Sequence, residues 1–201
     1  MKVIIVRHGQ TDDNAKTIVS GGGSDSALSA EGVNQAKKLG HWLKNEKIDV
    51  VYVSDQRRAI HTAEHILEHH PLLKIVKHKS LRERHYGEFE GKPDAIRDAA
   101  YEKSGLPFEL FKPKGGESCV EVYGRVEKFF SKLSKKHKDD TVLIVGHGRT
   151  IGLLLLKIFD KPIHEENQSA HKPANTGVAI LEILEGKPVK IHKLNSLEHL
   201  N

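Results

Sequence analysis

Two matching segments, residues 3–11 and 142–150, constrain the fold of this chain more strongly than any other feature of its sequence. Six of their nine positions are identical, and each segment passes from a continuous run of Val, Ile and Leu into His-Gly-x-Thr after one intervening residue. Continuous apolar runs of this length are typical of strands that are buried on both faces of a parallel sheet. We therefore expect both segments to be central strands that end at a histidine.

Other segments predict the remaining elements of an α/β fold. Residues 50–53 form a third candidate strand, and a Glu-Gly-Lys-Pro turn separates two more, 177–184 and 189–194, in a hairpin at a sheet edge. Apolar residues at helical spacing predict four helices, at 33–43 after a Ser29 cap, 59–67, 119–133 and 151–158. Strands that alternate with helices favour a three-layer α/β/α sandwich with a mostly parallel sheet.

One region does not follow this alternation. Residues 88–116 are rich in Gly, Pro and charged residues, and we interpret them as a short cap insertion over one end of the sheet. The chain has 201 residues and no segment that reads as a linker. We therefore expect a single domain over residues 1–201.

Cysteine content and hydropathy indicate the compartment. The single cysteine, Cys119, cannot form an internal disulfide, so a secreted disulfide scaffold is excluded. The longest apolar stretch, 151–156, is far shorter than a membrane span, and the apolar run at 3–6 is too short for a signal peptide. We expect a cytoplasmic protein that does not bind a membrane.

The charge balance argues against nucleic acid as a partner. The formal net charge is +5, from 32 Lys and Arg against 27 Asp and Glu. The one basic cluster, at residues 132–138, has no interleaved aromatic residues and no base-reading motif. We interpret these lysines as the solvated end of a helix.

The paired histidines, by contrast, predict an anion site. If the two long strands are neighbours, His8 and His147 face each other at the carboxyl ends of the strands, where α/β sheets bind ligands. The alternative, that each histidine only bonds a turn, does not account for the pair with Arg7 beside it. Histidine metal sites normally add carboxylates at ligating spacing, and neither segment has one. Arginine beside paired histidines suits a phosphoryl group better than a cation.

A second histidine pattern competes with this interpretation. His61 and His65 form the His-x-x-Glu-His spacing of one class of zinc peptidase, and His69 extends the same helix face. No third ligand is identifiable, so we favour a hydrated helix face and predict no metal. Sensitivity of an activity to chelators separates the two possibilities.

Six motifs in chain order resemble the histidine phosphatase superfamily, also called the phosphoglycerate mutase-like family. They are Arg-His-Gly-Gln-Thr-x-x-Asn at 7–14, Ser-Asp-x-x-Arg-Ala at 54–59, Leu-x-Glu-Arg-x-Tyr-Gly at 81–87 followed by Glu-Gly at 90–91, Gly-Glu-Ser at 116–118, Val-Gly-His-Gly at 145–148, and Asn-Thr-Gly at 175–177. The chain departs from the family pattern at Gln10, where glutamate is commoner, and in the glycine run at 21–23.

The resemblance implies a role for each matched residue. It implies that His8 is the nucleophile and forms a phosphohistidine, and that Glu83 is the general acid. It also implies phosphoryl contacts from the side chains of Arg7, Asn14, Ser20, Arg58 and His147. To donate a proton near neutral pH, Glu83 needs a pKa raised from about 4.3. We expect burial under the cap to supply that rise against the nearby arginines.

The implied activity is metal-independent hydrolysis of phosphate monoesters of small metabolites, with no cofactor. Residues 81–92 look like those of fructose-2,6-bisphosphatase-type regulators, and the cap is shorter than the insertion expected of mutases. The alternative is a cofactor-dependent phosphoglycerate mutase, which the Glu-Arg-His-Tyr-Gly form at 83–87 favours. A non-catalytic binding protein would be expected to lack His8 or Glu83. The sequence leaves open the substrate and the oligomeric state, a homodimer included.

Overall fold

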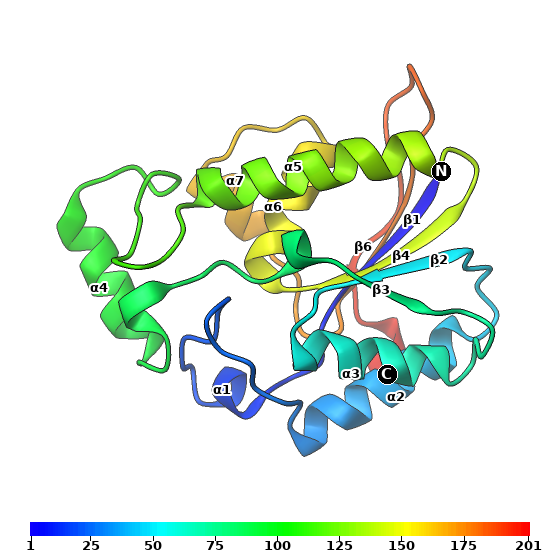
Figure 1. Cartoon of the computed structure of the whole chain (residues 1–201), viewed down its shortest axis with the longest axis horizontal. Helices are drawn as coiled ribbons and strands as arrows, with labels where there is room; N and C mark the ends of the chain where they lie inside the picture. The colour runs from blue at the N-terminus through cyan, green and yellow to red at the C-terminus, as the bar shows by residue number, and fades with distance from the viewer.

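A mixed sheet of six strands forms the centre of the computed structural model, which describes residues 1–201 apart from the side chain of Gln168 (Figure 1). The strands are β1 (Lys2–Arg7), β2 (Val50–Val53), β3 (Ile75–Lys77), β4 (Thr141–Gly146), β5 (Val178–Glu182) and β6 (Lys190–Ser196). Their spatial order is β3-β2-β4-β1-β5-β6. The first four are parallel to one another, and β5 and β6 form an antiparallel edge hairpin. The predicted mostly parallel sheet and its hairpin are confirmed.

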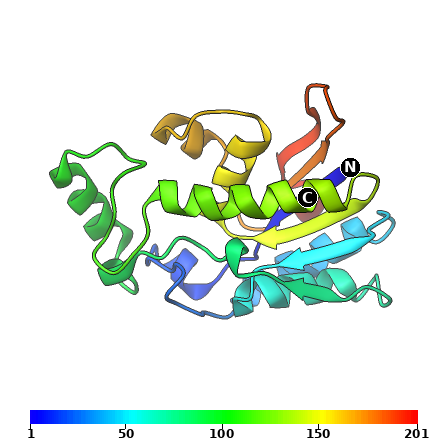
Figure 2. The same cartoon turned by 45° about the horizontal axis from the view of Figure 1, so that its top comes forward.

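Helices cover both faces of the sheet. Helices α2 (Ala30–Leu43) and α3 (Arg57–Leu67) pack on one face, and α5 (Cys119–Lys136) and α6 (Gly148–Ile158) pack on the other (Figures 1 and 2). This is the predicted three-layer α/β/α sandwich. The shorter helices are α1 (Asp12–Ala15), α4 (Asp94–Ser104) and α7 (Glu165–Ala170), with single 3-10 turns η1 (Lys79–Leu81), η2 (Gly87–Phe89) and η3 (Glu198–Leu200).

The central strands feed two separate cores because successive side chains in a strand point to opposite faces. Ile5 of β1 joins the core beneath α5 and α6, whereas its neighbour Ile4 joins the core beneath α2 and α3. In β4, Ile144 and Leu143 divide in the same way. Both faces of these strands are therefore apolar, which explains their unbroken Val, Ile and Leu composition.

Four elements lie outside the predicted set: α4, which forms within the predicted cap region, and three shorter elements. Strand β3 has three residues and pairs only with β2, and two of its residues are exposed. Helices α1 and α7 have four and six residues. Elements this short carry too few apolar positions to produce a period, and their neighbours in space hold them in place.

Residues 88–116 lie apart from the sandwich. Helix α4 stands at one end of the molecule, beyond the helices that cover the sheet (Figures 1 and 2). A small apolar cluster joins this region to the rest through Val19, Tyr86 and Phe89, against which Ala100 and Phe111 pack. None of the helices in the described part of the chain has the length and apolar character needed to span a bilayer.

Candidate active site

The paired histidines meet because β1 and β4 are neighbours in register. The strands pair in parallel from Lys2 with Thr141 to Arg7 with Gly146, so the residues that follow leave the sheet at the same edge. The ring centroids of His8 and His147 are 5.0 Å apart, with the planes inclined at 56°. The predicted convergence of the two segments is therefore confirmed.

His8 is held as a neutral ring with one nitrogen available. Its Nδ1–H donates to the carbonyl oxygen of Gly9 at 2.7 Å, which leaves the lone pair on Nε2. The pKa of His8 is well below its usual value because burial disfavours the charged ring and because Arg58 and Arg7 repel the added proton. A neutral imidazole with a free Nε2 is the form that a histidine nucleophile requires.

The turn after His8 is packed too closely for a side chain. A Cβ on Gly9 would lie 2.5 Å from the carbonyl oxygen of Gly32 in the first turn of α2. The Gly9 amide donates to Thr62 Oγ1 of α3 at 3.0 Å. Helices α2 and α3 thus hold the backbone on which His8 is mounted.

Arg58 is the most deeply buried cation of the site, at 1% exposure. Its Nε donates to Nδ1 of His147 at 3.2 Å, so the His147 proton is on Nε2, which donates to Ser54 Oγ at 2.8 Å. Both ring nitrogens of His147 are therefore engaged within the protein, and the ring orients Arg58. A direct bond from His147 to a phosphoryl oxygen requires a proton on Nδ1 in place of the Arg58 bond.

The loop at 20–24 supplies carbonyl groups to Arg58. Its guanidinium donates to the carbonyl oxygens of Gly21 at 3.1 Å and Ser24 at 3.2 Å. The side-chain amide of Gln56 donates to the same two oxygens, at 2.9 and 2.8 Å. Glu90 accepts from the amide of Gly21 at 2.8 Å and from Ser24 Oγ at 3.0 Å. Gln56 and Glu90 thus hold the loop in place, and the loop fixes the orientation of Arg58.

The glycine run in this loop has a steric cause. A Cβ on Gly21 would lie 2.3 Å from the carbonyl oxygen of Arg84, and one on Gly22 would lie 2.8 Å from that of Glu83. The run therefore lets the loop lie directly against the segment that carries Glu83. Ser20 lines the cavity described below, and its hydroxyl bonds those of Ser24 and Ser26 at 3.0 and 3.1 Å.

Glu83 lies at the N-terminus of α6. Its Oε2 accepts from the Arg149 amide at 3.0 Å, and its Oε1 accepts from the amides of Thr150 at 3.1 Å and Arg84 at 2.8 Å and from Thr150 Oγ1 at 3.1 Å. Burial acts to raise the pKa of Glu83, but these amides and the charges of Arg58 and Arg149 outweigh it and hold the pKa below its usual value. The expected raised pKa of Glu83 is wrong for this arrangement, because the sequence does not show the helix N-terminus that faces the carboxylate.

Arg7 and Asn14 come to the same edge from β1 and α1. Arg7 Nη1 donates to the carbonyl oxygen of Pro173 at 2.9 Å, and its buried Nε has no hydrogen-bond partner within the protein. Asn14 Oδ1 accepts from Asn175 Nδ2 at 3.1 Å, which directs the Asn14 amide group. Burial lowers the pKa of Arg7, and a nearby anion would offset that cost.

A cavity of about 250 Å³ opens beside these groups. Four of the predicted site residues, Arg7, Asn14, Ser20 and Glu83, line it. His8, Arg58 and His147 are almost fully buried and are not among the lining residues. The remaining lining residues are Thr17, Ile18, Val19, Tyr86, Asp94, Arg97, Arg149, Lys172 and Asn175.

Four positions at this site have no role predicted from the sequence, although Glu90 belongs to the Glu-Gly pair of the third motif. Arg149 and Lys172 line the cavity, while Gln56 and Glu90 hold the loop at 20–24. The sequence could have drawn attention to Arg149, because it replaces Gln10 at one of the three positions at which the two matching segments differ. Lys172 gave none, because a lone lysine in a polar stretch resembles any solvated lysine.

The other predicted clusters do not contribute to this site. His65 pairs with Glu68 at 2.7 Å on α3, and no group of three or more His, Cys, Asp or Glu residues in the described part of the chain is placed to hold a metal ion. Lys132 and Lys136 are exposed in the last turns of α5, as predicted.

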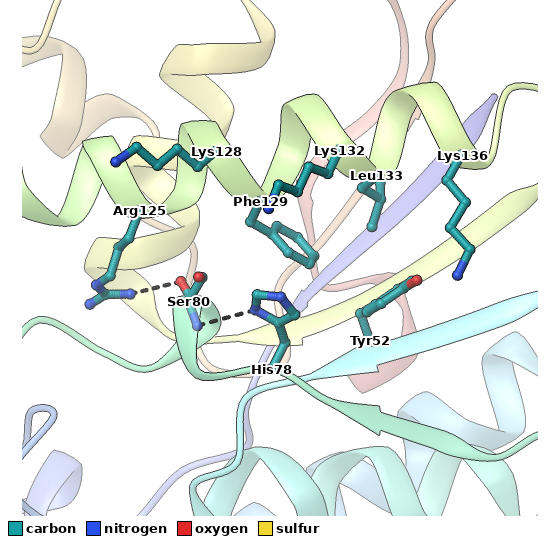
Figure 3. Close-up of a pocket in the computed structure, with 9 residues that line it drawn as sticks. All are labelled: Tyr52, His78, Ser80, Arg125, Lys128, Phe129, Lys132, Leu133 and Lys136. Carbon is teal, nitrogen blue, oxygen red and sulfur yellow. Dashed lines mark hydrogen bonds between the residues drawn. The ribbon is translucent and has the colours of Figure 1, made fainter.

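These lysines border a separate groove of about 330 Å³ between α5 and the ends of β2 and β3 (Figure 3). Lys128, Lys132 and Lys136 extend from α5 at this groove; Lys136 points towards Tyr52, whereas Lys128 points along the helix away from His78 and Tyr52 (Figure 3). None of the predicted site residues lines this groove. It is therefore distinct from the cavity beside His8.

The model of the histidine phosphatase superfamily (branch 1) matches residues 3–196 of this chain. The chain belongs to the histidine phosphatase superfamily. A 2,3-bisphosphoglycerate-dependent phosphoglycerate mutase of Brucella ovis is 32% identical over 189 residues, which cover 89% of this chain and 90% of the mutase. Fructose-2,6-bisphosphatase TIGAR of Xenopus tropicalis is 37% identical over 134 residues, which cover 65% of this chain and 49% of that protein. The alpha-ribazole phosphatase of Shigella flexneri has a TM-score of 0.86 and 27% identity, covering 98% of this chain and 97% of the other.

The Brucella mutase tests the expectation that mutases carry a longer cap insertion than this chain. Because the match covers 90% of the Brucella mutase, that enzyme has no room for a much longer insertion. A short cap therefore does not separate phosphatases from mutases in this part of the histidine phosphatase superfamily, and the expectation that mutases carry a longer insertion is wrong for this relative.

Proposed function

We propose that this member of the histidine phosphatase superfamily is a phosphoric monoester hydrolase that acts on small phosphorylated metabolites through a phosphohistidine at His8. The observation that carries the proposal is the state of His8: a neutral ring with Nε2 available, beside the buried Arg58 and the half-buried Arg7. Phosphoryl transfer depends mainly on positioning and on stabilising the charge of the transferred group. Arg7 and Arg58 supply that charge, and the proposal needs no metal.

In the first step, the lone pair of His8 Nε2 attacks phosphorus and the bond from phosphorus to the ester oxygen breaks. Glu83 gives its proton to the departing alkoxide, which leaves as an alcohol. In the second step, water attacks the phosphohistidine, Glu83 takes its proton, and inorganic phosphate and neutral His8 are released.

The low pKa of Glu83 constrains where its proton originates. A phosphate monoester has a second pKa of about 6, so part of it is a monoanion near neutral pH. We propose that the ester binds with this proton and passes it to Glu83. The arginines favour the dianion, and its charge beside the carboxylate raises the pKa of Glu83. On this account kcat/KM falls as the pH rises above about 6.

A mutase is the second candidate, and the extensive match to the Brucella mutase favours it. The two differ in what accepts the phosphoryl group from His8: water in a phosphatase, a second phosphoglycerate in a mutase. Hydrolysis is favoured here by the phosphatases among the similar proteins, TIGAR and the alpha-ribazole phosphatase.

The test is a panel of phosphorylated metabolites assayed for phosphate release without added metal, with mutase activity measured in parallel. We expect phosphate release by the wild type, acid-labile labelling of the protein by ³²P-labelled substrate, and loss of both in His8→Ala. His61→Ala, a histidine on α3 outside the site, is the matched control. Full hydrolysis by His8→Ala would show that the assignment of the nucleophile is wrong.

A further inference from the structure

The groove between α5 and the ends of β2 and β3 is lined by positive charge that no acidic residue offsets. Three exposed lysines of α5 line it, Lys128, Lys132 and Lys136, called the groove lysines below (Figure 3). A fourth cation, Arg125, bonds Glu117 at 3.0 Å and is compensated. No carboxylate from the described part of the chain belongs to the lining. A concave surface of one charge sign attracts ions of the opposite sign.

The acidic residues of α5 do not neutralise the groove lysines. Glu121 bonds Lys112 at 2.6 Å, and Glu127 bonds Lys157 at 2.7 Å. Within the part of the chain that the structure describes, no hydrogen bond or ion pair engages a groove lysine. Their charges are therefore available to a ligand.

The groove lysines recur every four residues along α5. Residues at this spacing lie on one face of a helix, and a rise of about 1.5 Å per residue separates the first from the third by about 12 Å. A single phosphate group cannot extend along this row, whereas a chain of linked phosphate groups can. An ammonium group binds phosphate oxygens as a point charge, so it imposes no fixed geometry on such a chain.

His78 adds a hydrogen-bond donor to the lining. Its ring packs against Phe129 with the ring centroids 4.6 Å apart, and its Nδ1 accepts from the Ser80 amide at 3.2 Å, so the ring proton is on Nε2. No acceptor among the described residues bonds this Nε2–H. The pKa of His78 is lowered by desolvation and then by the charge of Lys132, so the ring is neutral at pH 7.

The aromatic residues of the groove do not provide a stacking surface. Tyr52 is 9% exposed and Phe129 is 5% exposed, and the Tyr52 hydroxyl group bonds Nε2 of His137 at 3.0 Å. The groove is therefore suited to charge and to hydrogen-bond acceptors rather than to a planar ring. A flat partner, such as a bilayer or a DNA duplex, would contact the exposed lysines without entering the groove to reach His78.

We propose that this groove is a noncatalytic site for a soluble chain of linked phosphate groups, such as inorganic tripolyphosphate or the triphosphate of a nucleotide. The groove lysines bind phosphate oxygens along α5, and the Nε2–H of His78 donates to one of them. No bond is made or broken at this site. It goes beyond the proposed hydrolase and does not depend on it, because no predicted catalytic residue lines the groove.

Protection of lysines from chemical modification tests the site directly. The rate of reductive methylation at each lysine is measured by mass spectrometry with and without tripolyphosphate, in His8→Ala and without divalent metal, so that the ligand is not consumed. We expect at least threefold protection of Lys132 and Lys136. Lys135, an exposed residue of α5 that does not line the groove, is the internal control and should be unaffected. Equal protection of Lys135, or protection of Lys172 in the catalytic cavity alone, would overturn the site.

Variants then test the groove residues one at a time, with the protection of Lys136 at increasing ligand concentration giving the Kd. Lys132→Met should weaken the binding of tripolyphosphate at least fivefold. His78→Phe keeps a ring against Phe129 but removes the donor, and should weaken it at least twofold. Lys135→Met, with the same change of charge on the same helix, should keep the Kd of the parent. An unchanged Kd in Lys132→Met would overturn the proposal.

Other anions identify the source of the ligand and exclude a flat partner. ATP without metal that binds at least tenfold more tightly than tripolyphosphate would identify a nucleotide as the ligand, and equal or weaker binding would identify the bare chain. Both results support the groove as a site for linked phosphates. A DNA duplex or an equimolar phosphatidylserine–phosphatidylcholine vesicle that protects Lys136 equally in His78→Phe, where tripolyphosphate does not protect it, would overturn the proposal in favour of a flat polyanion.

Discussion

Replacing Glu83 by glutamine probes the part of the site in which the structure differs most from expectation. The Glu83 carboxylate accepts four hydrogen bonds, three from backbone amides and one from Thr150 Oγ1. An amide side chain has one accepting oxygen. If that oxygen takes the three donors at the Oε1 position, the glutamine NH₂ group faces the Arg149 amide donor-to-donor.

The expected loss of stability follows from this one unpaired amide donor. A buried amide left without an acceptor costs about 1–3 kcal/mol. For a chain of this size, each kcal/mol lowers the melting temperature by about 2–4 °C, so we expect Glu83→Gln to melt roughly 2–12 °C below the wild type at pH 7. The folded pKa of Glu83 is depressed, so its stabilisation is present above its unfolded pKa of about 4.3 and is lost as the pH falls through the folded pKa. The difference between variant and wild type should therefore narrow in acid.

The activity assay uses two esters with different leaving groups. Loss of a general acid costs about 10²–10⁴ in rate when the leaving group is an alkoxide. The loss is smaller for p-nitrophenyl phosphate, because its phenolate departs without a proton. Glu64→Gln, an exposed glutamate on α3, is the control and should match the wild type in both stability and rate.

Two results would refute this reasoning. An equal loss of rate on both esters would mean that Glu83 only supports the structure of the site. Retention of the wild-type rate on the alkyl ester, to within threefold, would mean that another group donates the proton.

Three further predictions concern stability and metal dependence. The pKa values of the buried His8 and His147 are lowered, and the pKa of His199 is lowered to about 4, so the unfolded chain binds more protons than the folded chain below pH 6.5. Urea denaturation should therefore show a free energy of unfolding that falls from pH 6.5 towards pH 4. The fall should be less steep in His199→Gln. In Gly21→Ala, the new Cβ would lie 2.3 Å from the Arg84 carbonyl oxygen, so we expect the free energy of unfolding to fall by about 1–3 kcal/mol. We also expect a lower kcat, because the loop that orients Arg58 is displaced. A variant as stable as the wild type would contradict this prediction. Phosphate release should be the same before and after dialysis against EDTA, and recovery only on adding Zn²⁺ would contradict the metal-independent route.

The sequence by itself predicts the central sheet and the convergence of His8 and His147. Residues 3–6 and 142–145 are apolar at every position because both faces of β1 and β4 are covered. The burial of these two strands can therefore be predicted from their composition. Parallel neighbours end at the same edge, and the shared His-Gly-x-Thr ending therefore implied that His8 and His147 come together. Arg7 is included in that inference because it immediately precedes His8.

The electrostatic character of the site arises from residues that are far apart in the chain. The pKa of Glu83 is lowered by an amide 66 positions away, at the start of α6, and the Arg58 bond to His147 joins residues 89 positions apart. Lys172 reaches the cavity only because the fold places it over Gly148 beside Arg7. Hydrogen bonds and charge interactions act over a few ångströms in space, and residue order does not record those separations until the sandwich has formed.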